Sequence, residues 1–287
     1  MAHSRSQKRQ LLANRSANVV LGVDTSNSVG GGTDNAIIAS TNSSIASHPT
    51  TARSATNSSI IGSSGSTITG AVGSAIIGGI SCTVESPTTS NDSYSVIVGG
   101  FSNNVDSSSY GYNSILGGQS NRVTGVTGWS GIVAGYQSIV DSGSSYTAIT
   151  GGKFHTVQTN SASSFLGGGW TNTMTTANRS AIVGGNGNTM TNVDRSSIVG
   201  GDGNAITNAD RSSIVGGDGN IVSGMDDVVM LGCVSRTATA AQTVHLEKLV
   251  IMDIPVGDST ATPDPLVALA LDVGTVYRDG NNLMIVT

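Results

Sequence analysis

A motif that recurs about every 16 residues constrains this fold more than any other feature of the sequence. Residues 180–195, 196–211 and 212–227 align without gaps, and each begins with Ser-Ala or Ser-Ser followed by Ile-Val-Gly-Gly. Following the isoleucine of this unit along the chain identifies thirteen copies, whose anchor residues lie 16 to 23 positions apart. The anchors are Val20, Ile37, Ile60, Ile76, Ile97, Ile115, Ile132, Ile149, Phe165, Ile182, Ile198, Ile214 and Met230. A repeat of this length is typical of a solenoid in which each copy forms one coil.

A second apolar column lies eight residues after the anchor and indicates a second strand in each coil. The residue that follows the Ile-Val pair is Gly in eleven copies and Ala at positions 39 and 134, which fits a sharp corner. β-Branched pairs next to Gly-Gly disfavour a helix. The sequence therefore predicts an all-β β-solenoid of about 13 coils, whose strands pair in register roughly 4.8 Å apart. The second column comprises Ile45, Ile68, Val84, Val105, Val123, Val140, Val157, Met190, Ile206 and Val222.

Composition excludes several classes of protein. Three Phe and two Trp among 287 residues are too few for a bulky globular core, while regularly spaced Ile and Val argue against disorder. A net charge of −5 with 11% charged residues argues against nucleic-acid binding and against a polybasic membrane surface. We expect no secretory leader, no membrane insertion and no disulfide, and we expect Cys82 and Cys233 to be small buried residues.

The residue after each anchor predicts self-association. Consecutive side chains of a strand point to opposite faces, so if the anchor points into the coil, its apolar neighbour points outward and needs cover. We expect that cover to be two further copies of the chain in a homotrimer, and the alternative is a monomer whose apolar stripe lies under loops. The predicted solenoid core is Ile60, Ile76, Ile97, Ile115, Ile132, Ile149, Ile182, Ile198 and Ile214. The predicted trimer wall is Leu21, Ile38, Ile61, Ile77, Val98, Leu116, Val133, Leu166, Val183, Val199, Val215 and Leu231.

The repeat unit resembles known fibrous proteins over residues 18–233. Segments such as Asn35-Ala36-Ile37-Ile38, Ser74-Ala75-Ile76-Ile77-Gly78-Gly79 and Ser196-Ser197-Ile198-Val199-Gly200-Gly201 are similar to the head repeat of YadA-type trimeric autotransporter adhesins. They are equally similar to repeats of bacteriophage tail and head fibres. The repeat is longer than the adhesin repeat, and Gly200 and its equivalents stand where the adhesin has a second inward aliphatic residue. The resemblance implies a trimeric β-solenoid with a structural role.

The two ends favour the fibre over the adhesin. An autotransporter adhesin needs a signal peptide and a C-terminal membrane barrel, and we expect neither here. Residues 1–17 carry Arg5, Lys8, Arg9 and Arg15, which are expected to anchor the chain in an acidic pocket of a virion protein; the alternative is a disordered solubilising tail. Residues 18–233 are the predicted shaft. Residues 234–287 are the predicted β cap or tip, with a hairpin that turns at Asp279-Gly280 and exposes Tyr277, Arg278 and Asp279.

The sequence contains few candidate metal-binding or ligand-binding sites. The segment Gly200-Gly201-Asp202-Gly203-Asn204 is similar to a calcium-binding nonapeptide but has Ala205 where a ligating Asp is needed. Asp202 and Asp218 are expected to stack on neighbouring coils, mainly as solvated turn residues. Arg179, Arg195 and Arg211 run parallel to Asp194, Asp210 and Asp226, which favours a structural ladder of alternating charge. We expect no metal site and no cofactor.

Function is expected to be structural. Glycoside hydrolysis needs two carboxylates at a set distance, but Glu85 and Glu247 are the only glutamates and the pattern shows no aromatic platform. We therefore expect a non-enzymatic phage tail or head fibre on the virion surface, with another virion protein and a host-surface glycan or protein as partners. The alternatives are a cell-surface trimeric adhesin, a fibre of a phage-derived injection system and, less favoured, a polysaccharide-degrading tailspike.

Overall fold

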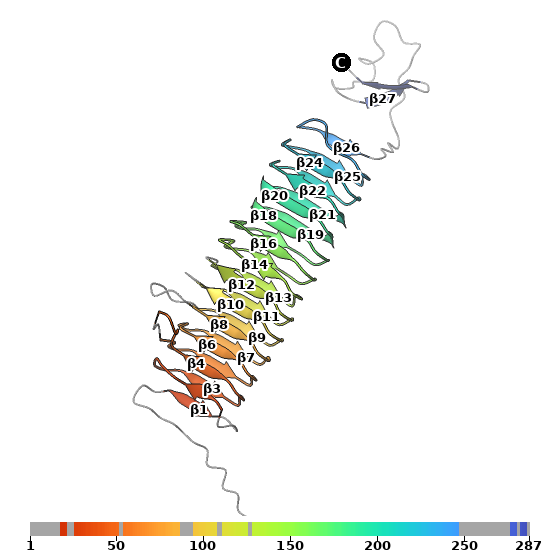
Figure 1. The fold of residues 1–287 in the computed structure, drawn as a ribbon. Helices are drawn as coiled ribbons and strands as arrows, with labels where there is room; N and C mark the ends of the chain where they lie inside the picture. Colours follow the sequence, from red (N-terminus) through yellow and green to blue (C-terminus); the bar gives the residue numbers. More distant parts are fainter. Residues whose placement is uncertain are drawn as a thin grey trace, which may run out of the picture. The chain divides into compact units, whose positions relative to one another are not determined.

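The chain forms a β-solenoid of two parallel β-sheets, in which successive coils each contribute one strand to each sheet as far as β24 (Figure 1). The structure is a computed structural model that describes residues 18–21, 26–51, 54–86, 94–107, 111–125 and 128–246, together with the strands at 276–279 and 282–285. Sheet A has 14 strands and sheet B has 12, and both sheets follow the chain order without crossing. The predicted β-solenoid is thus confirmed, with twelve coils that carry both strands and two further strands in sheet A.

The strands are short, most having three residues. Sheet A consists of β1 (Val19–Leu21), β3 (Ala36–Ile38), β5 (Ser59–Ile61), β7 (Ala75–Ile77), β9 (Val96–Val98), β11 (Ser114–Leu116), β13 (Gly131–Val133), β15 (Ala148–Ile149), β17 (Phe165–Leu166), β19 (Ala181–Asn186), β21 (Ser197–Asp202), β23 (Ser213–Val215), β25 (Val229–Leu231) and β26 (Val244–Leu246). Sheet B consists of β2 (Ser28–Val29), β4 (Ser44–Ala46), β6 (Thr67–Thr69), β8 (Thr83–Glu85), β10 (Asn104–Ser107), β12 (Arg122–Gly125), β14 (Ile139–Val140), β16 (Thr156–Gln158), β18 (Thr173–Asn178), β20 (Thr189–Asp194), β22 (Ala205–Thr207) and β24 (Ile221–Ser223).

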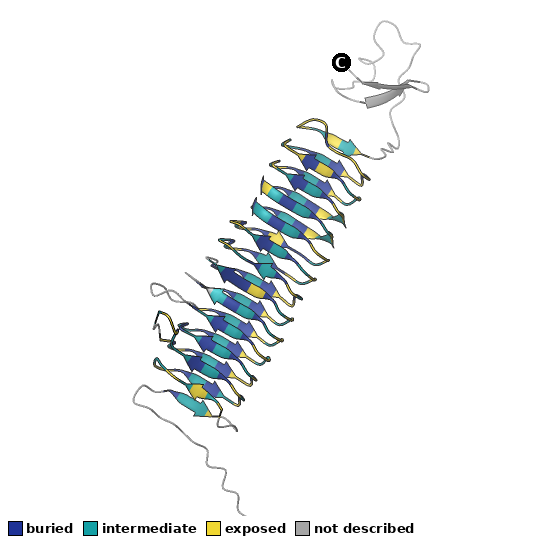
Figure 2. Cartoon of the chain, viewed as in Figure 1, coloured by how far each residue is buried: buried dark blue, intermediate teal, exposed yellow. Residues whose placement is uncertain are grey.

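The apolar core lies between the two sheets and is one or two side chains wide. All nine predicted core isoleucines, from Ile60 to Ile214, are fully buried, as are the residues of the second apolar column from Ile45 to Val222. Figure 2 shows buried residues at the same place on successive strands. Each anchor pairs with the anchor of the next coil, for example Ile198 with Ile214, so like residues stack along the solenoid.

One anchor was predicted on the wrong residue. Phe165 was expected in the core and Leu166 on the trimer wall, but Leu166 pairs with Ile182 and is fully buried, whereas Phe165 is 38% exposed. A shift of one residue moves a side chain to the other face of a strand, so this error exchanged the two roles. The same error hid Met174, which lies eight residues after Leu166 and is fully buried.

A column of buried polar side chains runs beside the core. It contains Asn103, Asn121, Asn172, Asn188, Asn204 and Asn220, with Ser138 and His155 at the two intervening positions. The amide of Asn188 donates to Gly184 O at 3.1 Å and to Gly201 O at 3.0 Å, while its Oδ1 accepts from Asn204 N at 3.0 Å. Each amide thus closes its own coil and satisfies a backbone N–H of the next one, which would otherwise be buried without a partner.

A second buried polar column occupies the position two residues before the inward-facing anchors, except at Met230, where Val228 takes this place. Ser196 Oγ donates to Ala209 O at 3.0 Å and accepts from Ser212 N at 3.1 Å. Ser180, Ser196 and Ser212 repeat the arrangement from coil to coil. The Ser or Asn that opens the repeat unit is therefore an internal hydrogen-bonding residue and not a surface turn residue.

The Gly-Gly pair makes a tight corner, as predicted. Gly201 has φ +89°, and a Cβ built on it would lie 2.3 Å from Gly217 O of the next coil. Glycine adopts this positive φ without strain and, having no Cβ, avoids the contact with the next coil. The coils can stack closely at this corner because it carries no side chain.

The solenoid continues beyond the expected boundary at residue 233. Strand β26 pairs in parallel with β25, and the chain divides into compact units after Leu246. In the second unit β27 (Val276–Asp279) pairs antiparallel with β28 (Asn282–Ile285), which confirms the predicted hairpin. Among the described residues, no helix is long and apolar enough to cross a bilayer.

Candidate functional site

The outer face of sheet A carries an apolar stripe, here called the outer ribbon, that follows the whole stack. It consists of the residues just after the anchors: Leu21, Ile38, Ile61, Ile77, Val98, Leu116, Val133, Val183, Val199, Val215, Leu231 and Leu246. Apart from Ile38, which is less exposed, these side chains are 37% to 49% exposed. The ribbon exists because every strand of sheet A alternates inward and outward residues in the same register.

Two coils lack an aliphatic residue in the ribbon, and an aromatic ring occupies the gap at one of them. Thr150 and Gly167 stand at the ribbon position there. A Cβ on Gly167 would lie 3.4 Å from Phe165 Cε1, so the ring of Phe165 lies beside this glycine on the outer face. The predicted wall residue Leu166 is absent from the ribbon because it points into the coil.

One long edge of sheet A carries a ladder of aromatic rings. This leading edge is the column three residues before each anchor and comprises Asp34, Asn57, Gly73, Tyr94, Tyr112, Trp129, Tyr146, Ser163, Arg179, Arg195, Arg211 and Asp227. Tyr94, Tyr112, Trp129 and Tyr146 stack in sequence with ring centroids 5.2, 5.0 and 5.2 Å apart and planes 3° to 19° from parallel. The rings are 41% to 59% exposed, so the ladder forms a narrow aromatic strip on the surface.

Sequence reasoning missed this ladder. The four aromatic residues are spaced 18, 17 and 17 positions apart, which equals the spacing of the anchors Ile97, Ile115, Ile132 and Ile149. The signal was therefore present as a fixed offset from the anchor. Their distance from one another in sequence conceals a contact that only parallel coils bring about.

The opposite long edge follows each strand of sheet A. This trailing edge is the column four residues after each anchor and comprises Thr41, Ser64, Ile80, Phe101, Gln119, Tyr136, Lys153, Trp170, Asn186, Asp202, Asp218 and Val234. Most neighbours in this column form parallel β-bridges from coil to coil. The Nζ of Lys153 lies 5.0 to 5.3 Å from the ring centroids of Tyr136, Phe154 and Trp170, which places the cation among three aromatic rings.

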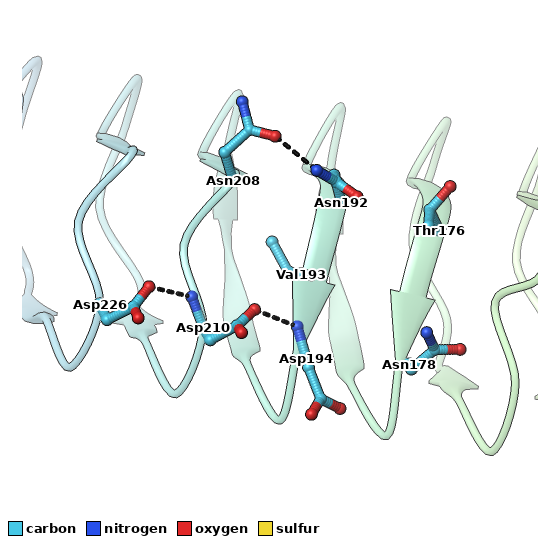
Figure 3. Close-up of a pocket in the computed structure, with 8 residues that line it drawn as sticks. All are labelled: Thr176, Asn178, Asn192, Val193, Asp194, Asn208, Asp210 and Asp226. Atoms are coloured by element: carbon cyan, nitrogen blue, oxygen red, sulfur yellow. Dashed lines mark hydrogen bonds between the residues drawn. The ribbon is translucent and has the colours of Figure 1, made fainter.

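The predicted columns of arginine and aspartate form a charged corner next to the leading edge. The backbone N–H of Asp194 donates to Asp210 Oδ1 at 2.8 Å, and that of Asp210 donates to Asp226 Oδ1 at 2.8 Å (Figure 3). Asp194 pairs with Arg179 and with Arg195, the latter at 3.2 Å. Asp194 therefore binds two guanidinium groups, and Asp210 and Asp226 each accept a backbone N–H of the preceding coil. These contacts within the chain support the structural interpretation of the ladder.

Arg211 extends this corner at its C-terminal end. Its Nε lies 2.6 Å from Asp227 Oδ1, and its Nη2 lies 3.5 Å from Asp226 Oδ2. The hydrogen bond from Arg211 lowers the pKa of the Asp227 carboxyl, and the same bond raises the pKa of Arg211. The hydrogen bond between Arg211 and Asp227 thus favours the charged form of both groups.

The calcium-like segment forms no cluster of ligands. Asp202 and Asp218 are bridge partners on the trailing edge, as expected from their spacing, and both are exposed. Within the part of the chain that the structure describes, no three His, Cys, Asp or Glu side chains are placed to hold a metal ion. Cys82 and Cys233 are free and buried, which confirms their predicted role as small buried residues.

A carboxylate pair lies on the outer face of sheet B. Glu85 and Asp106 are register partners on neighbouring strands, and His48 Nε2 lies 3.0 Å from Glu85 Oε1. Burial raises the pKa of the Asp106 carboxyl, and the nearby charge of Glu85 raises it further. Sequence reasoning considered Glu85 alone and missed Asp106, because the two lie 21 positions apart and meet only through the coil spacing.

The predicted anchor and tip residues lie largely outside the described part of the chain. Arg5, Lys8, Arg9 and Arg15 fall outside the described residues. For Tyr277, Arg278 and Asp279 the structure describes the backbone in β27 but not the side chains. The sequence matches no protein-family model and no curated protein.

Proposed function

We propose that this chain is the shaft-forming subunit of a virion fibre, that it assembles as a homotrimer through the outer face of sheet A, and that it is not an enzyme. The observation that carries the proposal is the outer ribbon. It places a solvent-exposed Leu, Ile or Val on nearly every coil from Leu21 to Leu246, always on the same face. A contiguous apolar surface of this kind marks an interaction site.

The length of the ribbon explains why association would be stable. Burying the exposed part of one such side chain contributes about 1 kcal/mol, so a single coil cannot hold chains together. Twelve ribbon residues acting together contribute about 12 kcal/mol, which is comparable to the ~4 to 15 kcal/mol of free energy that association costs in lost translational and rotational freedom. Small residues flank the ribbon, among them Ala75, Ser114 and Ala181, and allow another sheet to approach closely.

A role in a virion rests on the resemblance of the repeat unit to phage fibres. In this proposal residues 1–17 dock on another virion protein, and the C-terminal unit contacts a host-surface glycan or protein. The solenoid between them acts as a spacer whose parallel strands are linked by hydrogen bonds in both sheets. A cell-surface trimeric adhesin would use the same shaft.

Association is tested by sedimentation equilibrium of the full chain. We expect a species of three chains, and we expect the double variant Val199→Asp with Val215→Asp to shift the mass towards one chain. The matched control is Thr191→Asp with Thr207→Asp, which changes the outer face of sheet B and should leave the mass unchanged. A single chain for the parent protein would refute the homotrimer.

Location is tested by imaging particles. Antibody-labelled electron micrographs should show the protein on a phage head or tail, and labelling of bacterial cells without phage would favour the adhesin. Deletion of residues 1–16 should leave an associated shaft that no longer joins the particle. Unchanged incorporation of the deletion variant would remove the anchoring role of this segment.

A further inference from the structure

The two edges of sheet A carry matching chemistry in four coils. In the coil anchored by Ile97 the leading edge has Tyr94 and the trailing edge has Phe101, and in the coil of Ile132 they have Trp129 and Tyr136. Further along the chain the match changes from aromatic to ionic.

The ionic coils are those anchored by Ile198 and Ile214. The leading edge has Arg195 and Arg211 there, and the trailing edge has Asp202 and Asp218. An arginine thus lies on one edge and an aspartate on the other, at the same two levels of the stack. Each arginine also pairs within its own chain, Arg195 with Asp194 and Arg211 with Asp227.

Among the described residues, the two aspartates have no cationic partner. Asp202 and Asp218 are bridge partners on strands about 4.8 Å apart, so two like charges lie on neighbouring coils, an arrangement that destabilises a sheet. In the described ranges neither carboxylate has a Lys, Arg or His nitrogen within 4.0 Å; Asp202 accepts a hydrogen bond from Asn186 Nδ2 at 3.1 Å. All four charged side chains, the two arginines included, are exposed.

Symmetry decides which edges meet when copies of the chain face one another through the outer ribbon. Copies related by rotation about an axis along the stack are parallel, and the leading edge of one then meets the trailing edge of the next at the same coil. Copies related by a two-fold axis across the stack are antiparallel, and the leading edge then meets itself. Only the parallel arrangement brings Arg195 next to Asp202 and Arg211 next to Asp218.

We infer that this chain associates with copies of itself in a parallel, in-register arrangement in which the leading edge of one copy binds the trailing edge of the next. Aromatic residues meet in the coils of Ile97 and Ile132, and the arginines pair with the aspartates of the neighbouring copy in the coils of Ile198 and Ile214. The outer ribbon supplies affinity between the two edges, and the ionic coils fix direction and register. The inference deepens the proposed self-association but does not depend on the number of chains.

Disulfide cross-linking tests the pairing of the edges. The variant Arg195→Cys with Asp202→Cys carries one thiol on each edge of the same coil. Strand β21 (Ser197–Asp202) separates the two positions by on the order of 15 Å, far beyond the ~7 Å limit for Cα atoms of a disulfide, so a bond must join two copies. We expect most of the oxidised protein to run as covalent multimers on denaturing gels without reductant.

Three control proteins show whether a cross-link depends on the pairing of the two edges. The parent protein should not cross-link, because Cys82 and Cys233 are buried. The variant Arg195→Cys with Ser64→Cys places its thiols on distant coils and should not cross-link either. Cross-linking of Arg195→Cys alone would mean that leading edges meet each other, and this result would overturn the inference.

The cross-linking result is independent of the proposed trimer. Closed multimers of two or four chains would contradict the trimer but support the pairing of edges. A sedimenting trimer whose Arg195→Cys/Asp202→Cys variant stays unlinked would overturn the pairing and retain the trimer. Exchanging the two charges adds a second measurement. Asp202→Arg alone should weaken association about tenfold, because it places two arginines next to each other. The double variant Asp202→Arg with Arg195→Asp should restore association.

Discussion

Replacing Asn188 by alanine tests whether the buried amide column holds the coils together. The side chain makes three hydrogen bonds, two to the carbonyls of Gly184 and Gly201 and one from the backbone N–H of Asn204. Each buried hydrogen bond contributes about 0.5 to 1.5 kcal/mol, and the Asn204 amide would remain buried without an acceptor, which costs about 1 to 3 kcal/mol. We expect Asn188→Ala to lower the free energy of unfolding by about 3 kcal/mol.

The matched control is Asn188→Ser, because serine occupies the same column elsewhere in the stack. Ser43 Oγ accepts from Ser66 N at 3.3 Å, so a serine at position 188 should still satisfy the Asn204 amide. We expect this variant to lose roughly half as much stability as the alanine variant. The comparison separates the bond that Asn188 accepts from the Asn204 N–H from the two bonds that its amide donates, one within the coil to Gly184 and one to Gly201 of the next coil.

Denaturant unfolding measures the loss in free energy of unfolding. The protein concentration is kept fixed, because association adds to the apparent stability. Hydrogen exchange locates it, because neighbouring coils stabilise each other only locally in a repeat protein. The Asn204 amide should exchange about 100-fold faster in Asn188→Ala than in the parent. Equal losses for the Ala and Ser variants, or a loss below about 0.5 kcal/mol for Ala, would refute the reasoning.

Three further predictions concern other columns of the stack. Burial lowers the pKa of His155 below its ordinary value of 6.5, so the unfolded chain binds the proton more tightly than the folded chain. The free energy of unfolding should therefore decrease as pH falls below about 6.5, and unfolding of His155→Asn, measured from pH 7.5 to 5, should not show this loss. Gly201→Ala should lower the free energy of unfolding by more than 3 kcal/mol in thermal unfolding, whereas Gly203→Ala, with φ +60° and open space around its Cβ, should lower it by about 1 to 2 kcal/mol. Similar losses for the two variants would contradict the close contact of coils at Gly201. Trp129→Ala removes two ring stacks and should cost about 1 to 2 kcal/mol in denaturant unfolding, and an unchanged midpoint would show that the exposed ladder does not stabilise the stack.

The candidate site was only partly predictable. The outer ribbon followed from the apolar residue after each anchor, because a strand sends alternate side chains to opposite faces. The aromatic ladder and the pair of Glu85 with Asp106 did not follow, because their members lie 17 to 21 positions apart and meet only when coils stack. The buried role of Asn188 and Ser196 was also missed, since Asn and Ser are ordinary turn residues and the sequence does not show whether a turn side chain points inward.

The sequence by itself determined the period, the all-β solenoid and the identity of nearly every core residue, because a repeated Ile-Val-Gly-Gly unit can bury its isoleucines only by stacking on its neighbours. Tertiary structure decided whatever depends on the register between coils. It moved Leu166 into the core and Phe165 to the surface, and it placed Arg195 and Asp202 on opposite edges of one sheet. The physical reason is the two-residue alternation of a strand, which lets a shift of one position exchange inside and outside, so that only the hydrogen-bonded pairing of whole coils fixes each side chain.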